Sequence, residues 1–188
     1  MGTHRSRLGI GVGRSPLIDT DLLGSINVIR AALPHLRAQG HGRIIQISSA
    51  GGQTTYPNFS AYHAAKWGIE GFCQTVAMEV APFGIDVTIV EPGATPTGFS
   101  AAVARGRIMP EYENTPAGQV RQAIDSGAFT FPNDAGKITA AIIDMVDAGR
   151  TPLRLPLGLD TYEDIHASLT ARLAEHEQSK AVALSVAR

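Results

Sequence analysis

Residues 43–66 read RIIQISSAGGQTTYPNFSAYHAAK and predict a strand, a loop and a helix in direct succession. The apolar, β-branched run at residues 43–48 is typical of a buried strand. A loop rich in Gly, Thr, Pro and Asn follows, and Ser60 is a residue type that commonly caps a helix N-terminus. The chain is therefore expected to pass from the carboxyl end of a strand directly into a long helix.

Three polar side chains in this stretch are expected to meet. Ser49 ends the predicted strand, and Tyr62 and Lys66 are four residues apart on the predicted helix, so they share one helix face. Open α/β sheets bind ligands at the carboxyl ends of their strands. We therefore expect a hydroxyl, a phenol and an ammonium around one spot at that end.

This combination of groups suits acid–base chemistry on an oxygen atom. A phenol has an ordinary pKa of about 10, and a nearby cation lowers that pKa because it favours the phenolate. A tuned phenol can donate a proton to a carbonyl or accept one from an alcohol, while a serine hydroxyl holds the reacting oxygen. The groups predict carbonyl–alcohol interconversion, for which a nicotinamide cofactor would have to supply the hydride.

At these residues the chain resembles the short-chain dehydrogenase/reductase family. Ser49 lies 13 positions before Tyr62, as the catalytic serine of the family usually does, and Tyr62 and Lys66 fall on its Tyr-x-x-x-Lys motif. The sequence EPGATPT at residues 91–97 is similar to the Pro-Gly-x-x-x-Thr segment that follows the sixth strand of the family. The resemblance runs from about residue 17 to about residue 174.

The resemblance implies a set of site residues, a cofactor and a substrate class. It implies catalytic roles for Ser49, Tyr62 and Lys66, NAD or NADP as cofactor, and a small-molecule carbonyl or alcohol as substrate. The residues implied to contact the cofactor are Tyr62, Lys66, Pro92, Gly93 and Thr97.

Asp21 stands where the family commonly has an asparagine that is thought to hold a water in the proton relay. An ionised Asp only accepts hydrogen bonds, and its charge would raise the pKa of Tyr62. Asp21 is therefore either a fourth member of the site or a carboxylate placed favourably at a helix start.

Alternating elements favour an α/β fold with a parallel sheet. We expect helices at about 16–39, 60–82, 134–149 and 159–178, strands at 43–48, 85–91 and 153–157, and an irregular helical segment at about 97–126. The expected fold class is a three-layer, Rossmann-like parallel sheet that is incomplete, since it corresponds to the C-terminal half of the doubly wound fold. We assign residues 1–15 to a flexible tail, 16–178 to a partial domain of this type and 179–188 to a second tail.

The family's first strands and its Gly-rich cofactor turn are not found in intact form, which predicts an N-terminally truncated member. The Gly-x-Gly at residues 9–11 lacks the strand and helix that make such a turn bind phosphate. We therefore expect cofactor binding to be impaired. An alternative is a catalytically silent chain that acts as an interaction subunit or is a non-functional remnant. A hydrolase is disfavoured because no Gly-x-Ser-x-Gly surrounds Ser49.

Composition narrows the expected partners. With 16 basic and 17 acidic residues the net charge is −1, which argues against nucleic acid or a membrane as partner. The single cysteine, Cys73, excludes an intrachain disulfide, the six histidines show no metal-binding spacing, and His63 is expected to point away from the site. The absence of a signal-like or bilayer-length apolar run favours a cytoplasmic protein.

An incomplete sheet should leave one apolar strand edge open. The helices at 16–39 and 60–82 resemble those by which family members form dimers and tetramers, so the resemblance implies a homodimer or homotetramer. Residues 100–131 resemble the substrate-binding region of the family, with plain packing as the equal alternative.

Overall fold

The computed structural model describes residues 16–98 and 109–187. Within these ranges the sheet is built from three parallel strands in the order β1-β2-β3. The strands are β1 (Gly42–Ile47), β2 (Ile85–Pro92) and β3 (Arg154–Leu157). Each lies within about one residue of the range predicted from the sequence, and the parallel α/β class is confirmed.

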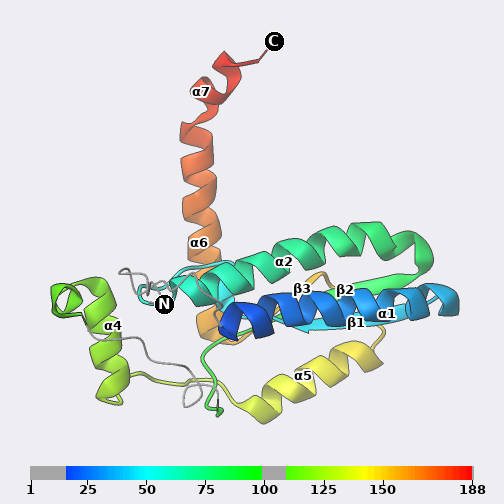
Figure 1. Cartoon of the computed structure of the whole chain (residues 1–188), viewed down its shortest axis with the longest axis horizontal. Helices are drawn as coiled ribbons and strands as arrows, with labels where there is room; N and C mark the ends of the chain where they lie inside the picture. Colours follow the sequence, from blue (N-terminus) through cyan, green and yellow to red (C-terminus); the bar gives the residue numbers. More distant parts are fainter. Residues whose placement is uncertain (1–15, 99–108, 188) are drawn as a thin grey trace, which may run out of the picture.

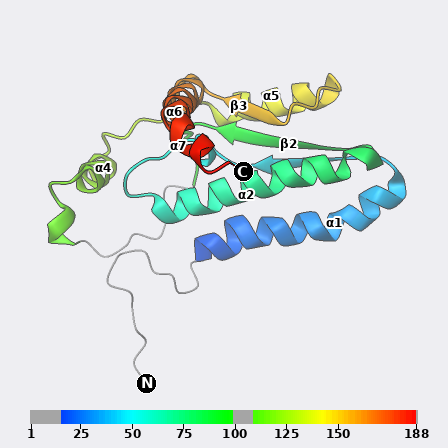
Figure 2. The same ribbon diagram turned by 90° about the horizontal axis from the view of Figure 1, so that it is seen from above.

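Helices cover both faces of the sheet. The main ones are α1 (Ser25–Gln39), α2 (Ser60–Val80), α4 (Pro116–Asp125), α5 (Ala135–Asp147), α6 (Leu159–Gln178) and α7 (Lys180–Ser185), with short helical turns η2 (Ala50–Gly52), η3 (Ala81–Phe83) and η4 (Pro110–Tyr112). Helices α1 and α2 lie side by side on one face, and α5 lies on the other (Figures 1 and 2). This is the three-layer arrangement that the alternating sequence pattern predicts.

The pairing register brings the strand ends together. Ile47 of β1 pairs with Val90 of β2, and Pro92 of β2 pairs with Leu157 of β3. Because the strands run parallel, the segments that follow them leave the sheet at the same end, where the strands have their carboxyl termini. Ser49 and Gly93 therefore start from neighbouring positions.

The core lies between α2 and the sheet. Apolar residues of α2 recur at the spacing of one helix face and pack against alternate residues of β2. The fully enclosed members are Ile29, Ile69, Cys73, Val76, Val80, Ile85, Val87 and Ile89. Cys73 is thus a core residue, as its place in the apolar pattern predicts.

The first helix is not the regular α-helix that the sequence predicts for residues 16–39. Its first part is a π-helix, η1 (Ile18–Gly24), which packs on α2 before α1 begins. Leu22 lies over Gly68, where an added Cβ would come within 3.2 Å of the leucine side chain. The π-helical turn includes both Leu22 and Asp21.

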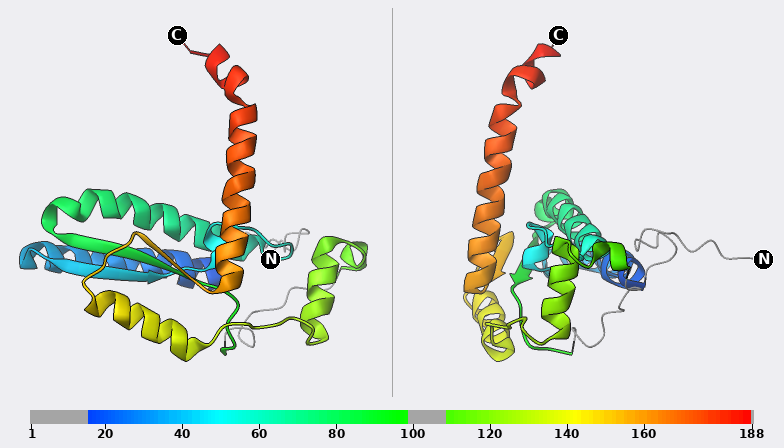
Figure 3. Two further views of the ribbon diagram at one scale, coloured as in Figure 1. Left: turned by 180° about the vertical axis from the view of Figure 1, so that it is seen from behind. Right: turned by 90° about the vertical axis from the view of Figure 1, so that its left-hand side faces the viewer.

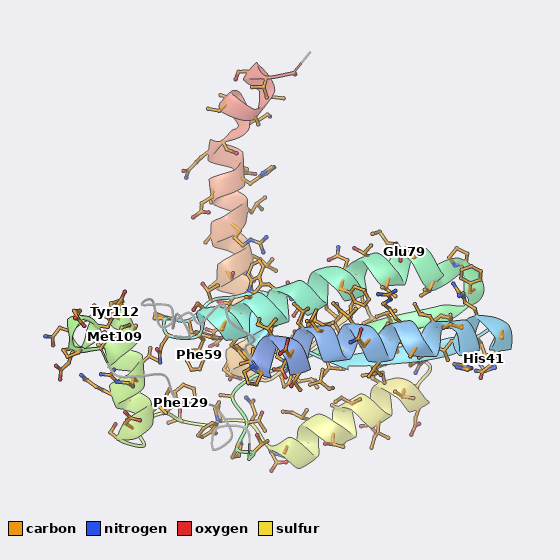
Figure 4. The ribbon with its side chains drawn as sticks, viewed as in Figure 1. His41, Phe59, Glu79, Met109, Tyr112 and Phe129 are labelled. Atoms are coloured by element: carbon orange, nitrogen blue, oxygen red, sulfur yellow. The ribbon has the colours of Figure 1, made fainter. Side chains whose placement is uncertain are left out.

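The segment around α4 stands apart from the sheet. Of the helical segment predicted at 97–126, the structure has η4 and α4, while residues 99–108 are outside the described ranges. Figure 3 shows α4 separated from the layers, and Figure 4 shows Met109 and Tyr112 beside it, on the side where Phe59 begins α2. His41 and Glu79 lie at the opposite end of the molecule in the same view.

Helix α6 starts at the sheet and then extends away from it, and α7 continues the projection (Figures 1 and 3). Residues 179–188 were predicted as a tail, and residues 180–185 of it form α7. Within the described residues β1 is an edge strand that pairs only with β2, as expected for an incomplete sheet. Its Ile45 and Ile47 side chains are 37% and 47% exposed. In the two described ranges, no helix has the length and hydrophobicity needed to cross a bilayer.

Replacing Ile69 by Ala should destabilise the fold strongly. The side chain is fully buried between α2 and β2, so truncation leaves a cavity and should lower the free energy of unfolding by about 2–5 kcal/mol. Met78→Ala on the same helix is the matched control, because Met78 is 68% exposed and should cost less than about 0.5 kcal/mol. Urea denaturation followed by circular dichroism measures both. Equal losses for the two variants would contradict the assignment of the α2 core face.

Candidate active site

Ser49 begins the turn that leaves β1. Its backbone is extended, and its Oγ accepts a hydrogen bond of 3.1 Å from the Gly51 N–H, which caps the short helix η2. The turn lies directly against α2, since a Cβ at Gly51 would come within 2.9 Å of the Tyr62 ring. Glycine at this position therefore lets the tyrosine approach the serine.

Tyr62 and Lys66 come from the first two turns of α2, as predicted. The Ser49 side chain lies close enough to Tyr62 to lower the pKa of the phenol through a hydrogen bond. The Lys66 Nζ lies 5.7 Å from the centre of the Tyr62 ring. The structure thus brings together the three groups that the sequence predicts to meet at the carboxyl end of the sheet.

Asp21 joins this group from η1. Its Oδ2 lies 3.9 Å from the Lys66 Nζ, and the two side chains are 25% and 12% exposed. Asp21 also lies in the first turn of η1. It is therefore both a neighbour of the site residues and a carboxylate at a helix start, the two positions that the sequence analysis considers. The π-helical turn is what sets the carboxylate beside α2.

The pKa of Tyr62 is raised, mainly because burial disfavours the phenolate. The Ser49 hydrogen bond opposes this change, and the charge of Asp21 adds to it. The expectation that Lys66 lowers the pKa of Tyr62 is therefore wrong for the net shift, because desolvation dominates. Burial also lowers the pKa of Lys66, while Asp21 and Glu70 raise it. Tyr62 consequently keeps its proton near neutral pH.

The segment after β2 lies at the same carboxyl end of the sheet, and α6 holds it there. The Gly93 N–H donates to the Leu157 carbonyl at 3.0 Å, and a Cβ at Gly93 would run into Asp160 and Thr161. Asp160 accepts a 2.9 Å hydrogen bond from the Ala94 N–H. The predicted cofactor residue Pro92 thus ends β2 and Gly93 follows it, at the same end of the sheet as Ser49. Thr97 lies one residue before the end of the described range at residue 98.

His63 braces the serine loop, a role that the sequence analysis missed. Its Nε2 accepts a 2.8 Å hydrogen bond from the Tyr56 N–H, and its Nδ1 lies 2.8 Å from the Gly51 carbonyl oxygen. The tautomer with the proton on Nδ1 satisfies both contacts. The expectation that His63 points away from the site is wrong, because its ring lies against Gly51 in the turn that follows Ser49. The sequence offers no signal for this contact, because it forms only when the loop folds onto α2.

Helix α6 also holds this loop. The Tyr56 hydroxyl donates to Asp164 Oδ2 at 2.6 Å, and the Ser168 hydroxyl donates to the Gln53 carbonyl at 2.7 Å. Nothing local in the sequence indicates these contacts, because the partners are more than 100 residues apart. Over the described ranges, no group of three or more His, Cys, Asp or Glu residues is arranged to hold a metal ion.

Known proteins are similar to this chain in sequence and fold. The family model described as short chain dehydrogenase matches residues 15–107. Oxidoreductase BOA17 of Botryotinia fuckeliana is 32% identical over 170 residues, which are 90% of this chain and 61% of that protein. A trans-4-hydroxycyclohexanecarboxylate dehydrogenase of Sinomonas cyclohexanicum is 34% identical over 137 residues, which are 71% of this chain and 50% of that protein.

Solved structures agree. A short-chain dehydrogenase from Streptomyces avermitilis matches with a TM-score of 0.78 at 35% identity, covering 92% of this chain and 62% of that one. A short chain dehydrogenase from Burkholderia cenocepacia, in complex with NADP, matches with a TM-score of 0.56 at 21% identity, covering 88% and 60%, and this likeness concerns the fold alone. The chain spans about half to three-fifths of the length of these proteins.

Replacing Asp21 by Asn should lower the pKa of Tyr62. The carboxylate is one of the causes that raise this pKa, so its removal favours the phenolate. NMR titration of the chain with ¹³C-labelled tyrosine measures the change. Asp19→Asn is the matched control, because Asp19 lies on the same turn but is exposed. An unchanged Tyr62 titration in Asp21→Asn, or an equal change in the control, would contradict the placement of Asp21.

Proposed function

Because the chain belongs to the short-chain dehydrogenase family, we propose that it carries the proton-transfer site of an NAD(P)-dependent oxidoreductase that interconverts a carbonyl and an alcohol. The observation that carries this proposal is the half-buried Tyr62 phenol, on whose pKa a hydrogen bond with Ser49 has a lowering effect and which has the Lys66 ammonium beside its ring. Such a site can deliver one proton to a substrate oxygen and hold that oxygen while it does so.

Each group has a distinct part in reduction. Tyr62 donates its proton to the carbonyl oxygen, and its raised pKa ensures that the proton is present near neutral pH. The Ser49 hydroxyl donates a hydrogen bond to the same oxygen as negative charge develops on it. The Lys66 ammonium stabilises the phenolate that remains, because an opposite charge nearby favours the ionised form. Alcohol oxidation uses the same groups in the reverse direction.

The donor set near Tyr62 fits the nicotinamide–ribose half of a dinucleotide. The Lys66 ammonium has three donors, and the contact to Asp21 at 3.9 Å leaves some of them available for ribose hydroxyls. The Tyr62 hydroxyl would also contact the ribose. Pro92, Gly93 and Thr97 would lie beside the nicotinamide. When bound, the cofactor supplies the hydride.

The Gly-x-Gly at residues 9–11 is outside the described ranges, so impaired binding of NAD or NADP stays a prediction. The Sinomonas relative is named for a hydroxylated cyclohexanecarboxylate, which supports a small alcohol or ketone as the substrate class for this proposal.

We also propose that the protein self-associates, since Val28 on α1 and Met78 on α2 are 70% and 68% exposed.

Replacing Tyr62 by Phe should abolish turnover while leaving the fold intact. The phenyl ring keeps the packing, and the loss of the proton donor should lower kcat by about 100-fold or more. Oxidation of NADH or NADPH with a panel of small cyclic ketones measures this. Tyr162→Phe on α6 is the control, because the Tyr162 side chain is largely exposed and lies outside the site.

Two results would overturn the proposal. A Tyr62→Phe chain as active as the parent would exclude Tyr62 as the proton donor. A parent chain that is folded but inactive with every ketone and both cofactors would favour the silent interaction subunit instead.

A further inference from the structure

A buried cluster of polar side chains lies beside the proposed site and is not used by its chemistry. Glu70 of α2 and Glu91 of β2 are 3% and 0% exposed. Glu70 comes one helical turn after Lys66, on the side of α2 that faces the sheet. Two carboxyl groups this deeply buried need partners, because burial of an unpaired charge is costly.

Glu70 is connected to the turn that carries Ser49. Its Oε1 accepts a 2.6 Å hydrogen bond from the hydroxyl of Ser48, which is itself buried. An added Cβ at Gly52 would run into the Glu70 carboxylate and the Ser48 hydroxyl, so the backbone of η2 lies directly on these groups. Glu70 therefore contacts the chain on both sides of Ser49.

The other side of the cluster is anchored in the sheet. Arg154 of β3 places its Nε 3.4 Å from Glu70 Oε2 and 3.3 Å from Glu91 Oε1. Gln53 donates a 2.7 Å hydrogen bond to Glu91 Oε1. The cluster thus joins β2, β3 and both ends of the η2 turn to the helix that carries Tyr62 and Lys66.

We infer that Glu70 is a positioning residue for Ser49: through Ser48 and the Gly52 backbone, its carboxylate fixes the serine turn against α2. This inference rests on the proposed function for its catalytic consequence, whereas its structural part does not. Glu70 acts on the reaction only through the placement of the Ser49 hydroxyl relative to Tyr62.

The charge of the cluster depends on whether the Glu91 carboxyl is protonated. Burial, followed by the neighbouring Glu70 carboxylate, raises the pKa of Glu91 to about 8, although Arg154 and Gln53 oppose the shift. Near neutral pH the Glu91 carboxyl therefore keeps its proton. Above about pH 8 it ionises next to Glu70, and Arg154 is the one guanidinium that contacts both side chains. The groups that face the pair are Ser48, Gln53, Lys66, Cys73 and Arg154.

Ser48→Ala is the gentlest test, because it removes one hydroxyl and no charge. Hydrogen–deuterium exchange of residues 48–53 should become about tenfold faster in this variant, since the turn loses its tie to Glu70. Thr75→Ala is the matched control: it removes a hydroxyl that donates to Gly71 on the exposed face of α2, and exchange at 48–53 should not change. Unchanged exchange in Ser48→Ala would overturn the inference, whether or not the protein has the proposed activity.

A double-mutant cycle separates positioning from general damage. Ser48→Ala should lower kcat about tenfold with little change in KM in the parent, and should have almost no further effect on kcat in Ser49→Ala. An equal loss of kcat in both backgrounds would show that the effect does not pass through Ser49, and would overturn the inference. A parent without turnover would contradict the proposed function alone, and the exchange experiment would still decide the structural part.

Glu91→Gln tests the role of the proton. In the parent, exchange at residues 48–53, corrected for the intrinsic pH dependence, should rise as the pH passes about 8, because the second carboxylate ionises. The amide of Glu91→Gln cannot ionise, so this rise should be absent. A corrected rise of the same size in both proteins would overturn the link between the carboxyl pair and the serine turn.

Discussion

The packing of one face of α2 against β2 and the η2 turn determines the relative positions of Ser49, Tyr62 and Lys66 in the proposed site. Ile69 lies at the centre of that contact, and Lys66 and Glu70 flank it on the same helix. Because β1 and β2 run parallel in a fixed register, Ser49 and Gly93 leave the sheet at one edge. The site is thus a consequence of ordinary core packing, with the polar groups placed where the packed layers end.

Burial then sets the electrostatics. The same enclosure that orders Tyr62 raises its pKa, and the cation beside it does not reverse that shift. Asp21 and Glu70 help to keep Lys66 charged despite its desolvation. We therefore view the site as a proton donor held ready near neutral pH, with two carboxylates that support the lysine from η1 and from α2.

Much of the fold and of the arrangement of the site residues was predictable from local sequence patterns. The strand before Ser49 and the helix from Ser60 follow from side-chain periodicity, and the convergence of Ser49, Tyr62 and Lys66 follows from spacing alone. The π-helical turn η1 was not predictable, because it packs on α2 and the two segments meet only in the folded protein. Nor were the contacts of Glu70 with Arg154, since they join residues that meet only in the folded protein. The net pKa of Tyr62 was mispredicted because a sequence shows a neighbouring charge but not the degree of burial.

The most direct test of the whole account is isotope transfer in a single reaction. The chain is incubated with a small cyclic ketone and NADPH or NADH that carries deuterium at both C4 positions of the nicotinamide, and the alcohol is analysed by mass spectrometry. The account predicts one deuterium in each alcohol molecule, bonded to the carbon that carries the new hydroxyl, with the hydroxyl proton coming from Tyr62. Alcohol without deuterium, or no alcohol from a folded chain, would contradict it.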